Sequence, residues 1–184
     1  MLLKLLLLDA DIVISAHELE VWENLTKIAE VHLPSIVIRK CEPYYYIDKN
    51  GNKKYIEDLR ILVQKGVVFE ESASVSQLLE IEKLLDIATE TGLSKADKEA
   101  LAIMISTKKN FIFCTGDKKI IRKLVSLDLK EKSVSMETLL KSCGLERAVP
   151  DKRSEKYFKR WLEIGAVDFV TQGKQPKHKK RHAK

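Results

Sequence analysis

The chain has 184 residues, of which 45% are hydrophobic, so we expect one well-buried domain with a small appendage. Its 33 basic and 27 acidic side chains give a net charge of +6. The three cysteines, Cys41, Cys114 and Cys143, lack the spacing of metal ligands. This excludes a disulfide framework or zinc site as the organising principle and favours a reducing, cytoplasmic setting.

The apolar run MLLKLLLL at the start ends at two acids, Asp9 and Asp11. A secretory signal has a basic start, about 7–15 apolar residues and a small-residue cleavage site. Here Lys4 interrupts the run, and the acids follow where apolar residues should continue. A membrane-spanning helix needs about 20 apolar residues, and the sequence has no such run. We therefore expect residues 2–8 to form a strand buried on both faces, and no association with a membrane.

The rest of the sequence alternates between strand and helix patterns. One expected helix is capped by Ser35 and includes Glu42, and Asn50 followed by Gly51 predicts a hairpin turn within residues 44–56. The other expected elements are a helix over 17–30, a strand over 31–34, a helix over 57–65, a strand over 67–69, a helix over 78–92, a helix from Ser94, a strand over 111–115, a helix over 118–127, a short strand and helical turn over 133–142, and a helix after Pro150.

Such alternation predicts an α/β fold, a mostly parallel central sheet covered by helices on both faces. Ligands of such sheets bind beyond the carboxyl ends of the strands, near the switch point. The two most apolar expected strands both end in acids there, one in Asp9 and Asp11 and the other in Asp117. The sequence therefore predicts a cluster of carboxylates at one edge of the sheet.

Clustered carboxylates need a counter-charge. Two of them about 5 Å apart repel by about 3 kcal/mol at an effective dielectric near 20. Mg²⁺ and Mn²⁺ usually offset this repulsion because these ions prefer oxygen ligands. They can also activate water for attack on a phosphate. The sequence lacks a Walker-type phosphate loop, a GxGxxG turn, a GxSxG elbow and a paired-His zinc motif. Carboxylate-plus-metal chemistry is the remaining interpretation with several independent supports.

The segments LLLLDADIVIS, LPSIVIRKCE, LSKADKEALAI and FIFCTGDKKIIRKL, in this order, resemble a PIN-domain ribonuclease over about residues 1–145. The resemblance implies a three-layer α/β/α sandwich, one or two Mg²⁺ or Mn²⁺ ions at an acidic cluster, and hydrolysis of RNA by water. It implies a PIN-like domain over 1–147 with a hairpin inserted near 44–56. We also expect a helical extension over 148–170, which the resemblance does not explain because many relatives are shorter. An antitoxin-type or ribonucleoprotein partner and a homodimer are further expectations from the resemblance.

Matched motif by motif, the resemblance assigns the catalytic acids as Asp9, Glu42, Asp97 and Asp117, with Asp9, Asp97 and Asp117 as metal ligands. The family often has Asn where this chain has Asp11, so Asp11 is expected to orient the site or to ligate metal.

Each of these residues also has a structural interpretation. Asp97 forms a capping-box pattern with Ser94, Asp117 could cap the next helix, and Glu42 could be a solvated helix end. Three secondary candidates remain. Glu99 is the second choice for the acid on the Ser94 helix, Thr115 could hydrogen-bond Asp9 or a metal-bound water, and His17 could pack or reach substrate.

Two other functions are compatible with the sequence. DADIV also fits the DxDx(T/V) pattern of haloacid-dehalogenase-type phosphatases, in which Asp9 would be the nucleophile and Asp11 the general acid. That assignment lacks a second acid after Asp117 and leaves Glu42 and Asp97 unused. The other alternative is a PIN-like module that binds RNA without cutting it.

The net charge belongs to the last 14 residues, 171–184, which hold six bases and no acid. Such a tail cannot bury apolar surface, so we expect it to be disordered, either as a solubilising end or as an arm that binds RNA phosphates. The bases are Lys174, Lys177, Lys179, Lys180, Arg181 and Lys184.

Overall fold

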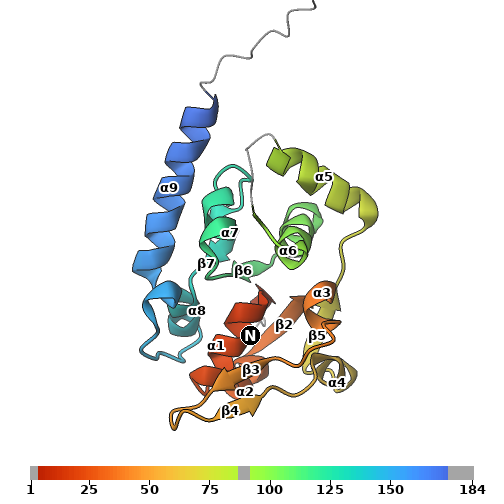
Figure 1. Ribbon diagram of the computed structural model, residues 1–184, viewed down its shortest axis with the longest axis vertical. Helices are drawn as coiled ribbons and strands as arrows, with labels where there is room; N and C mark the ends of the chain where they lie inside the picture. Colours follow the sequence, from red (N-terminus) through yellow and green to blue (C-terminus); the bar gives the residue numbers. More distant parts are fainter. Residues whose placement is uncertain (1–3, 87–91, 174–184) are drawn as a thin grey trace, which may run out of the picture.

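The computed structural model describes residues 4–86 and 92–173, and its centre is a five-stranded parallel sheet (Figure 1). The strand order is β5-β2-β1-β6-β7, so the chain builds outwards from β1 first in one direction and then in the other. The strands are β1 (Lys4–Leu8), β2 (Ala29–Pro34), β5 (Val68–Glu71), β6 (Ile112–Cys114) and β7 (Ser133–Val134). The switch point predicted for such a sheet therefore lies between β1 and β6.

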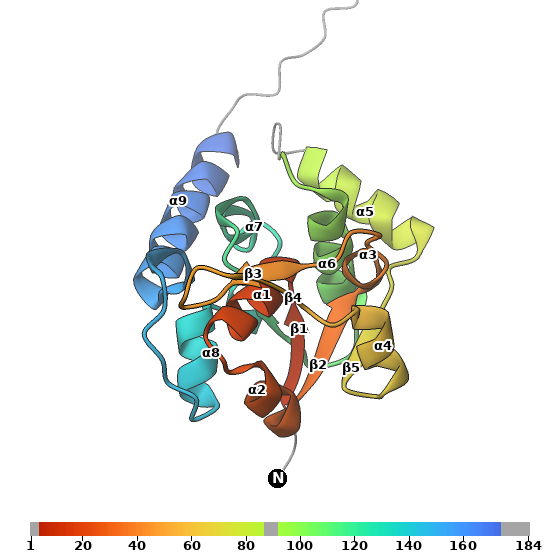
Figure 2. The same ribbon diagram turned by 60° about the horizontal axis from the view of Figure 1, so that its bottom comes forward.

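Helices cover both faces of this sheet, as the alternating side chains of β1 require. Leu6 and Leu8 pack under one layer, whereas Leu7 packs under the other, and all three are fully buried. The first layer holds α1 (Ala10–Glu18), α2 (Trp22–Ile28), α4 (Leu59–Gln64) and α8 (Met136–Ser142). The second holds α5 (Val75–Asp86), α6 (Lys95–Ser106), α7 (Lys118–Lys123) and α9 (Glu155–Gly173). The predicted α/β/α sandwich is confirmed (Figures 1 and 2).

Three expected helices differ from the observed ones. The helix predicted over 17–30 is two helices, α1 and α2, because the backbone turns at Glu20, whose φ is 56°. The helix predicted to include Glu42 is α3 (Ser35–Ile38), which ends before that residue. Ser35 does not cap α3 but is its first residue. The helix predicted over 78–92 is α5, and residues 87–91 lie outside the described part of the chain.

The predicted hairpin is confirmed. Strands β3 (Tyr45–Ile47) and β4 (Lys53–Tyr55) pair antiparallel as a separate two-stranded sheet. The turn depends on Gly51, whose φ of 78° favours glycine, and on the carboxylate of Asp48, which accepts from the backbone N–H groups of Asn50 and Asn52.

The C-terminal extension is part of the same core. After the 3₁₀ turns η1 (Lys130–Lys132) and η2 (Asp151–Arg153), α9 runs beside α7 (Figure 1). Phe158 and Leu162 of α9 are buried, and a Cβ at Gly165 would lie only 2.3 Å from the Arg122 carbonyl oxygen. Residues 171–173, predicted to begin the disordered tail, are the last turn of α9, and residues 174–184 lie outside the described part. Within the described ranges, no helix is long and apolar enough to cross a membrane.

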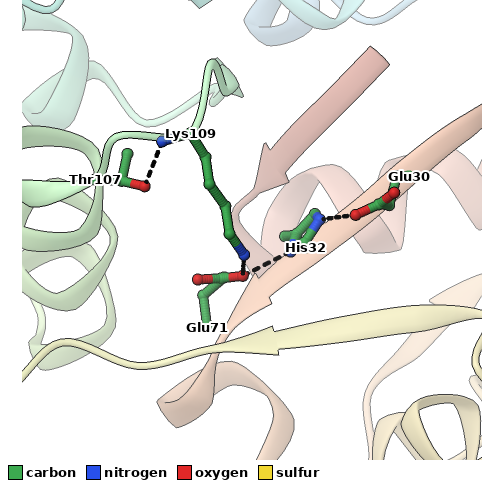
Figure 3. Close-up of polar contacts among 5 residues, drawn as sticks. All are labelled: Glu30, His32, Glu71, Thr107 and Lys109. Carbon is green, nitrogen blue, oxygen red and sulfur yellow. Dashed lines mark hydrogen bonds and ion pairs between the residues drawn. The ribbon is translucent and has the colours of Figure 1, made fainter. Parts of the chain in front are cut away.

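A cluster of polar side chains around the buried ring of His32 links β2 to β5 (Figure 3). The two ring nitrogens of His32 lie 2.8 Å from carboxylate oxygens of Glu30 and Glu71, and Lys109 Nζ lies 2.5 Å from the same Glu71 oxygen. The backbone N–H of Lys109 in turn donates to Thr107. Because ionised carboxylates only accept hydrogen bonds, both His32 contacts are hydrogen bonds when the ring carries two protons. The cluster thus joins β2, β5 and the segment before β6 through pairs of basic and acidic side chains.

Candidate active site

Four aspartates from three segments of the chain line one cavity of about 300 Å³ at the carboxyl ends of β1 and β6. Asp9 and Asp11 follow β1, Asp97 comes from the first turn of α6, and Asp117 follows β6. Parallel strands on either side of a switch point diverge beyond their carboxyl ends and leave a crevice there. The cavity therefore lies where the strand pattern of the sequence predicted an acidic cluster.

Asp9 is the most buried of these acids, with 9% of its surface exposed. One carboxylate oxygen caps α1 by accepting from the Ile12 backbone N–H at 2.9 Å, and the other accepts from the Thr115 hydroxyl at 2.5 Å. Burial raises the pKa of Asp9 to about 6, although both hydrogen bonds lower it. The charge of Asp11 raises this pKa slightly further and that of Arg153 lowers it. Asp9 is thus a fixed carboxylate whose charge is incompletely compensated by the protein.

Asp97 has its predicted capping role and also lies at the acidic cavity. It forms the capping box of α6, in which its carboxylate accepts from the Ser94 N–H at 2.7 Å and the Ser94 hydroxyl accepts from the Asp97 N–H at 3.2 Å. It also lines the acidic cavity. Burial raises the pKa of Asp97, and the charges of Asp117 and Asp11 contribute to this rise.

Asp117 likewise caps a helix and lines the cavity. Its carboxylate accepts from the Lys119 N–H at 2.6 Å at the start of α7. Its own N–H donates to the Thr115 hydroxyl oxygen at 3.1 Å. Thr115 thereby connects Asp117 to Asp9, which confirms the predicted hydrogen bond between Thr115 and Asp9.

Two cations that the sequence analysis did not select lie beside the acids. Lys119 lines the cavity, where its ammonium donates to the Gly92 carbonyl oxygen at 2.9 Å. Arg153 lies 3.5 Å from the Asp11 carboxylate and donates to the Ser15 hydroxyl at 2.8 Å. The separation of Arg153 from these partners along the chain explains why no local pattern pointed to it.

The structure separates Glu42 from the four aspartates. Glu42 is exposed and lies beyond the end of α3, where it lines a different cavity of about 240 Å³. The residue before a proline is disfavoured in the α conformation, and Pro43 follows Glu42. The expectation that Glu42 sits on a helix facing the acids was wrong, because α3 already ends at Ile38.

Glu99 is buried on α6, with 3% of its surface exposed, but it does not line the acidic cavity. Its carboxylate accepts from the Ser35 hydroxyl at 2.6 Å and from the Ile36 N–H at 2.8 Å. Glu99 therefore accepts hydrogen bonds from the first turn of α3 and links that short helix to α6. This placement gives Glu99 a structural role.

His17 is placed away from the acidic cavity. Its ring stacks on Trp22 and Tyr46 with centroid separations of 5.0 Å and 5.8 Å. Burial lowers the pKa of His17 to about 4, so the ring is neutral at physiological pH. The packing role considered for His17 matches this position.

The donor set of the acidic cavity suits a hard divalent cation. Its four carboxylates offer only oxygen ligands, and the buried, incompletely compensated charge of Asp9 is what a cation would relieve. Asp9, Asp97 and Asp117 each also have lone pairs beyond those engaged in capping. In the conformations present, no three His, Cys, Asp or Glu side chains of the described ranges are close enough together to hold a metal ion.

The fold and this cavity define a parallel α/β protein with an acidic site at its topological switch point. No protein-family model matches the chain, and searches of curated proteins and of solved structures give no match either.

Proposed function

We propose that the protein is an Mg²⁺- or Mn²⁺-dependent ribonuclease of the PIN-like type. The observation that carries this proposal is the convergence of Asp9, Asp11, Asp97 and Asp117 on one cavity at the switch point. Four acids around a cavity repel a polyanion unless cations are bound between them. A bound ion would activate a water molecule and offset charge on the scissile phosphate.

The protein's own residues have separable tasks in this mechanism. Asp9, Asp97 and Asp117 would hold the ion, and Thr115 keeps Asp9 oriented by its hydrogen bond. The proposal requires the three carboxylates to draw closer together when the ion binds. Lys119 adds a positive charge at the cavity, where a phosphate of the substrate would approach.

The test uses purified protein with Mn²⁺, a labelled single-stranded RNA and, in parallel, a generic phosphomonoester. We expect metal-dependent cleavage of the RNA, and loss of that cleavage in Asp9→Asn, which keeps the shape of the side chain. Activity on the phosphomonoester alone would overturn the proposal in favour of the phosphatase.

One observation favours the RNA-binding module without catalysis. Only three of the four acids assigned from the resemblance line the cavity, since Glu42 lies elsewhere. In the nuclease proposal Asp11 takes the place of the missing fourth carboxylate. Binding of RNA without Mn²⁺-dependent cleavage would support the module and remove the nuclease.

The basic tail supplies the proposed attraction for RNA. If all six of its bases met phosphates of a single strand, log affinity would fall with log salt with a slope of about −4. Deleting residues 174–184 should flatten this slope and leave Mn²⁺ binding unchanged. An unchanged slope would make the tail a solubilising end.

A further inference from the structure

The hairpin of β3 and β4 presents an aromatic face to solvent. Tyr45 and Tyr55 are opposite each other in the register of the two strands, with ring centroids 6.3 Å apart. They are 47% and 62% exposed, and Ile47 on the same face is 50% exposed. In a two-stranded ribbon alternate side chains share a face, so Lys53, opposite Ile47, belongs to this face too. We call Tyr45, Ile47, Lys53 and Tyr55 the hairpin platform.

The opposite face of the ribbon is packed on the domain, which orients the platform outwards. Tyr46 on that face stacks on His17 of α1, and Ile56 at the base of the hairpin is 5% exposed. The hairpin therefore has an inner face that anchors it on α1, over which β3 passes (Figure 2), and an outer face that packing does not use.

Lys53 carries the positive charge of the platform. Its ammonium lies 3.9 Å from the Tyr45 ring centroid and 4.9 Å from that of Tyr55. The neighbouring lysines have acidic partners, since Lys49 pairs with Glu20 and Lys54 with Asp48. Within the described ranges, Lys53 has no carboxylate partner. Its charge is therefore available to an anion that approaches the rings.

The platform is connected to the acidic cavity through the base of the hairpin. The Tyr44 hydroxyl donates to the Val37 carbonyl oxygen at 3.2 Å, and Val37 lines the cavity. β3 follows directly after Tyr44 and packs on α1, the helix that carries Asp11. The hairpin therefore adjoins elements that line the acidic cavity.

We propose that the hairpin platform is a binding subsite for single-stranded RNA, in which bases stack on Tyr45 and Tyr55 and Lys53 contacts a phosphate. Exposed aromatic rings beside a cation are the combination that single-strand binding proteins use, because every base has a face that can stack. A protein partner fits less well, because docking on this face would bury the unpaired ammonium of Lys53, and lysine is depleted from protein interfaces. The inference rests on the proposed ribonuclease function and adds to it where unpaired bases are held.

The test measures binding of a fluorescein-labelled oligouridylate about 12 nucleotides long to the full-length protein in EDTA, so that no cleavage occurs. We expect Tyr45→Ala and Tyr55→Ala each to weaken binding by about 5- to 150-fold, the usual loss per stacked base. Tyr45→Phe and Tyr55→Phe keep a stacking ring and should bind like the wild type. Phe169→Ala is the matched control, because Phe169 on α9 is 53% exposed and lies outside the platform.

Salt dependence separates the platform from the tail. Stacking releases no counterions, so RNA affinity should fall by the same factor in the tyrosine variants at low and at high salt. Lys53→Gln should reduce the salt slope by about 0.7, as expected for one phosphate of a single strand. Near-ultraviolet circular dichroism of each variant reports whether the domain still folds, and the Phe variants keep the test valid if an Ala variant does not.

Wild-type affinity in the Tyr45→Ala, Tyr55→Ala double variant would overturn the subsite. If that variant instead changed the sedimentation coefficient while binding RNA normally, the platform would be a contact between copies of the chain. Neither result would bear on Mn²⁺-dependent cleavage. Conversely, if the wild type did not cleave RNA but the Tyr45→Ala and Tyr55→Ala variants bound it more weakly as expected, only the nuclease proposal would be removed.

Discussion

The Thr115 hydroxyl donates a hydrogen bond of 2.5 Å to the Asp9 carboxylate, although the two residues are 106 positions apart in the sequence. This contact joins the end of β6 to the end of β1 across the switch point. The Thr115 hydroxyl oxygen also accepts a hydrogen bond from the Asp117 N–H, so this threonine connects two of the cavity acids. The geometry of the acidic cavity therefore depends on a residue that carries no charge.

Replacing Thr115 tests this dependence. Thr115→Val keeps the shape of the side chain but removes its hydroxyl, leaving the buried Asp9 carboxylate and the Asp117 N–H without that partner. We expect a loss of about 1–3 kcal/mol in the free energy of unfolding by urea. Mn²⁺ affinity should fall by about 10- to 100-fold, as for other groups that orient a ligand. Thr115→Ser should restore both, and equal behaviour of Val and Ser would refute the role of the hydroxyl.

The raised pKa of Asp9 predicts a specific dependence of stability on pH. Because this pKa is about 6 in the folded protein and 3.8 in the reference state, the folded state binds the proton more tightly. The contribution of Asp9 to stability is complete below about pH 4 and is lost as the pH rises through about 6, a change of about 3 kcal/mol. The groups that shift the Asp9 pKa, besides burial, are Thr115, Ile12, Asp11 and Arg153.

Asp9→Asn should remove this dependence, since Asn can also cap α1. Without metal, we expect the variant to gain stability relative to the wild type as the pH increases from about 4 to 7, measured by urea unfolding at each pH. The difference between the two proteins isolates Asp9, because the other acids titrate in both. A difference that does not change with pH would contradict the buried, uncompensated carboxylate.

Some parts of the fold and of the cavity could be predicted from the sequence, whereas others could not. The strands ending in Asp9 and Asp117 could be predicted because a run of apolar residues closed by acids is a local pattern. Glu42 was misplaced because α3 ends at Ile38, four residues before it, and no local pattern in the sequence marks that end. Glu99 contacts Ser35, 64 residues away, and Arg153 contacts Asp11, 142 residues away, so only the folded structure reveals their roles.

Asp97 and Glu99 are two residues apart on α6, and we expect opposite consequences from their replacement. Glu99→Ala leaves the Ser35 hydroxyl and the Ile36 N–H without their acceptor, which should cost about 2–4 kcal/mol of unfolding free energy. The rise in melting temperature caused by Mn²⁺ should remain. In Asp97→Asn, the amide oxygen can still serve the capping box, so stability should change by less than about 1 kcal/mol while the Mn²⁺ effect disappears. The reverse pattern would make Glu99 the metal ligand.

Gly116 and Arg153 form the last pair that can be tested. A Cβ on Gly116 would lie 1.9 Å from Nη1 of Arg153, so Gly116→Ala forces the guanidinium away from Ser15 and Asp11. Arg153→Ala removes the same contacts directly. We expect each variant to lose about 1 kcal/mol of unfolding free energy, and the double variant to lose no more than Arg153→Ala alone.

The coupling energy of this double-mutant cycle is therefore expected to be about 1 kcal/mol, well above the deviation found for independent sites. Asp128→Ala offers a reference for the cycle, because Asp128, on the loop between α7 and η1, has none of the contacts that hold Arg153. Its effect should add to that of Arg153→Ala. If the losses from Gly116→Ala and Arg153→Ala also added, the glycine would act through the backbone of the turn after β6, and the close approach of Arg153 would not be what requires it.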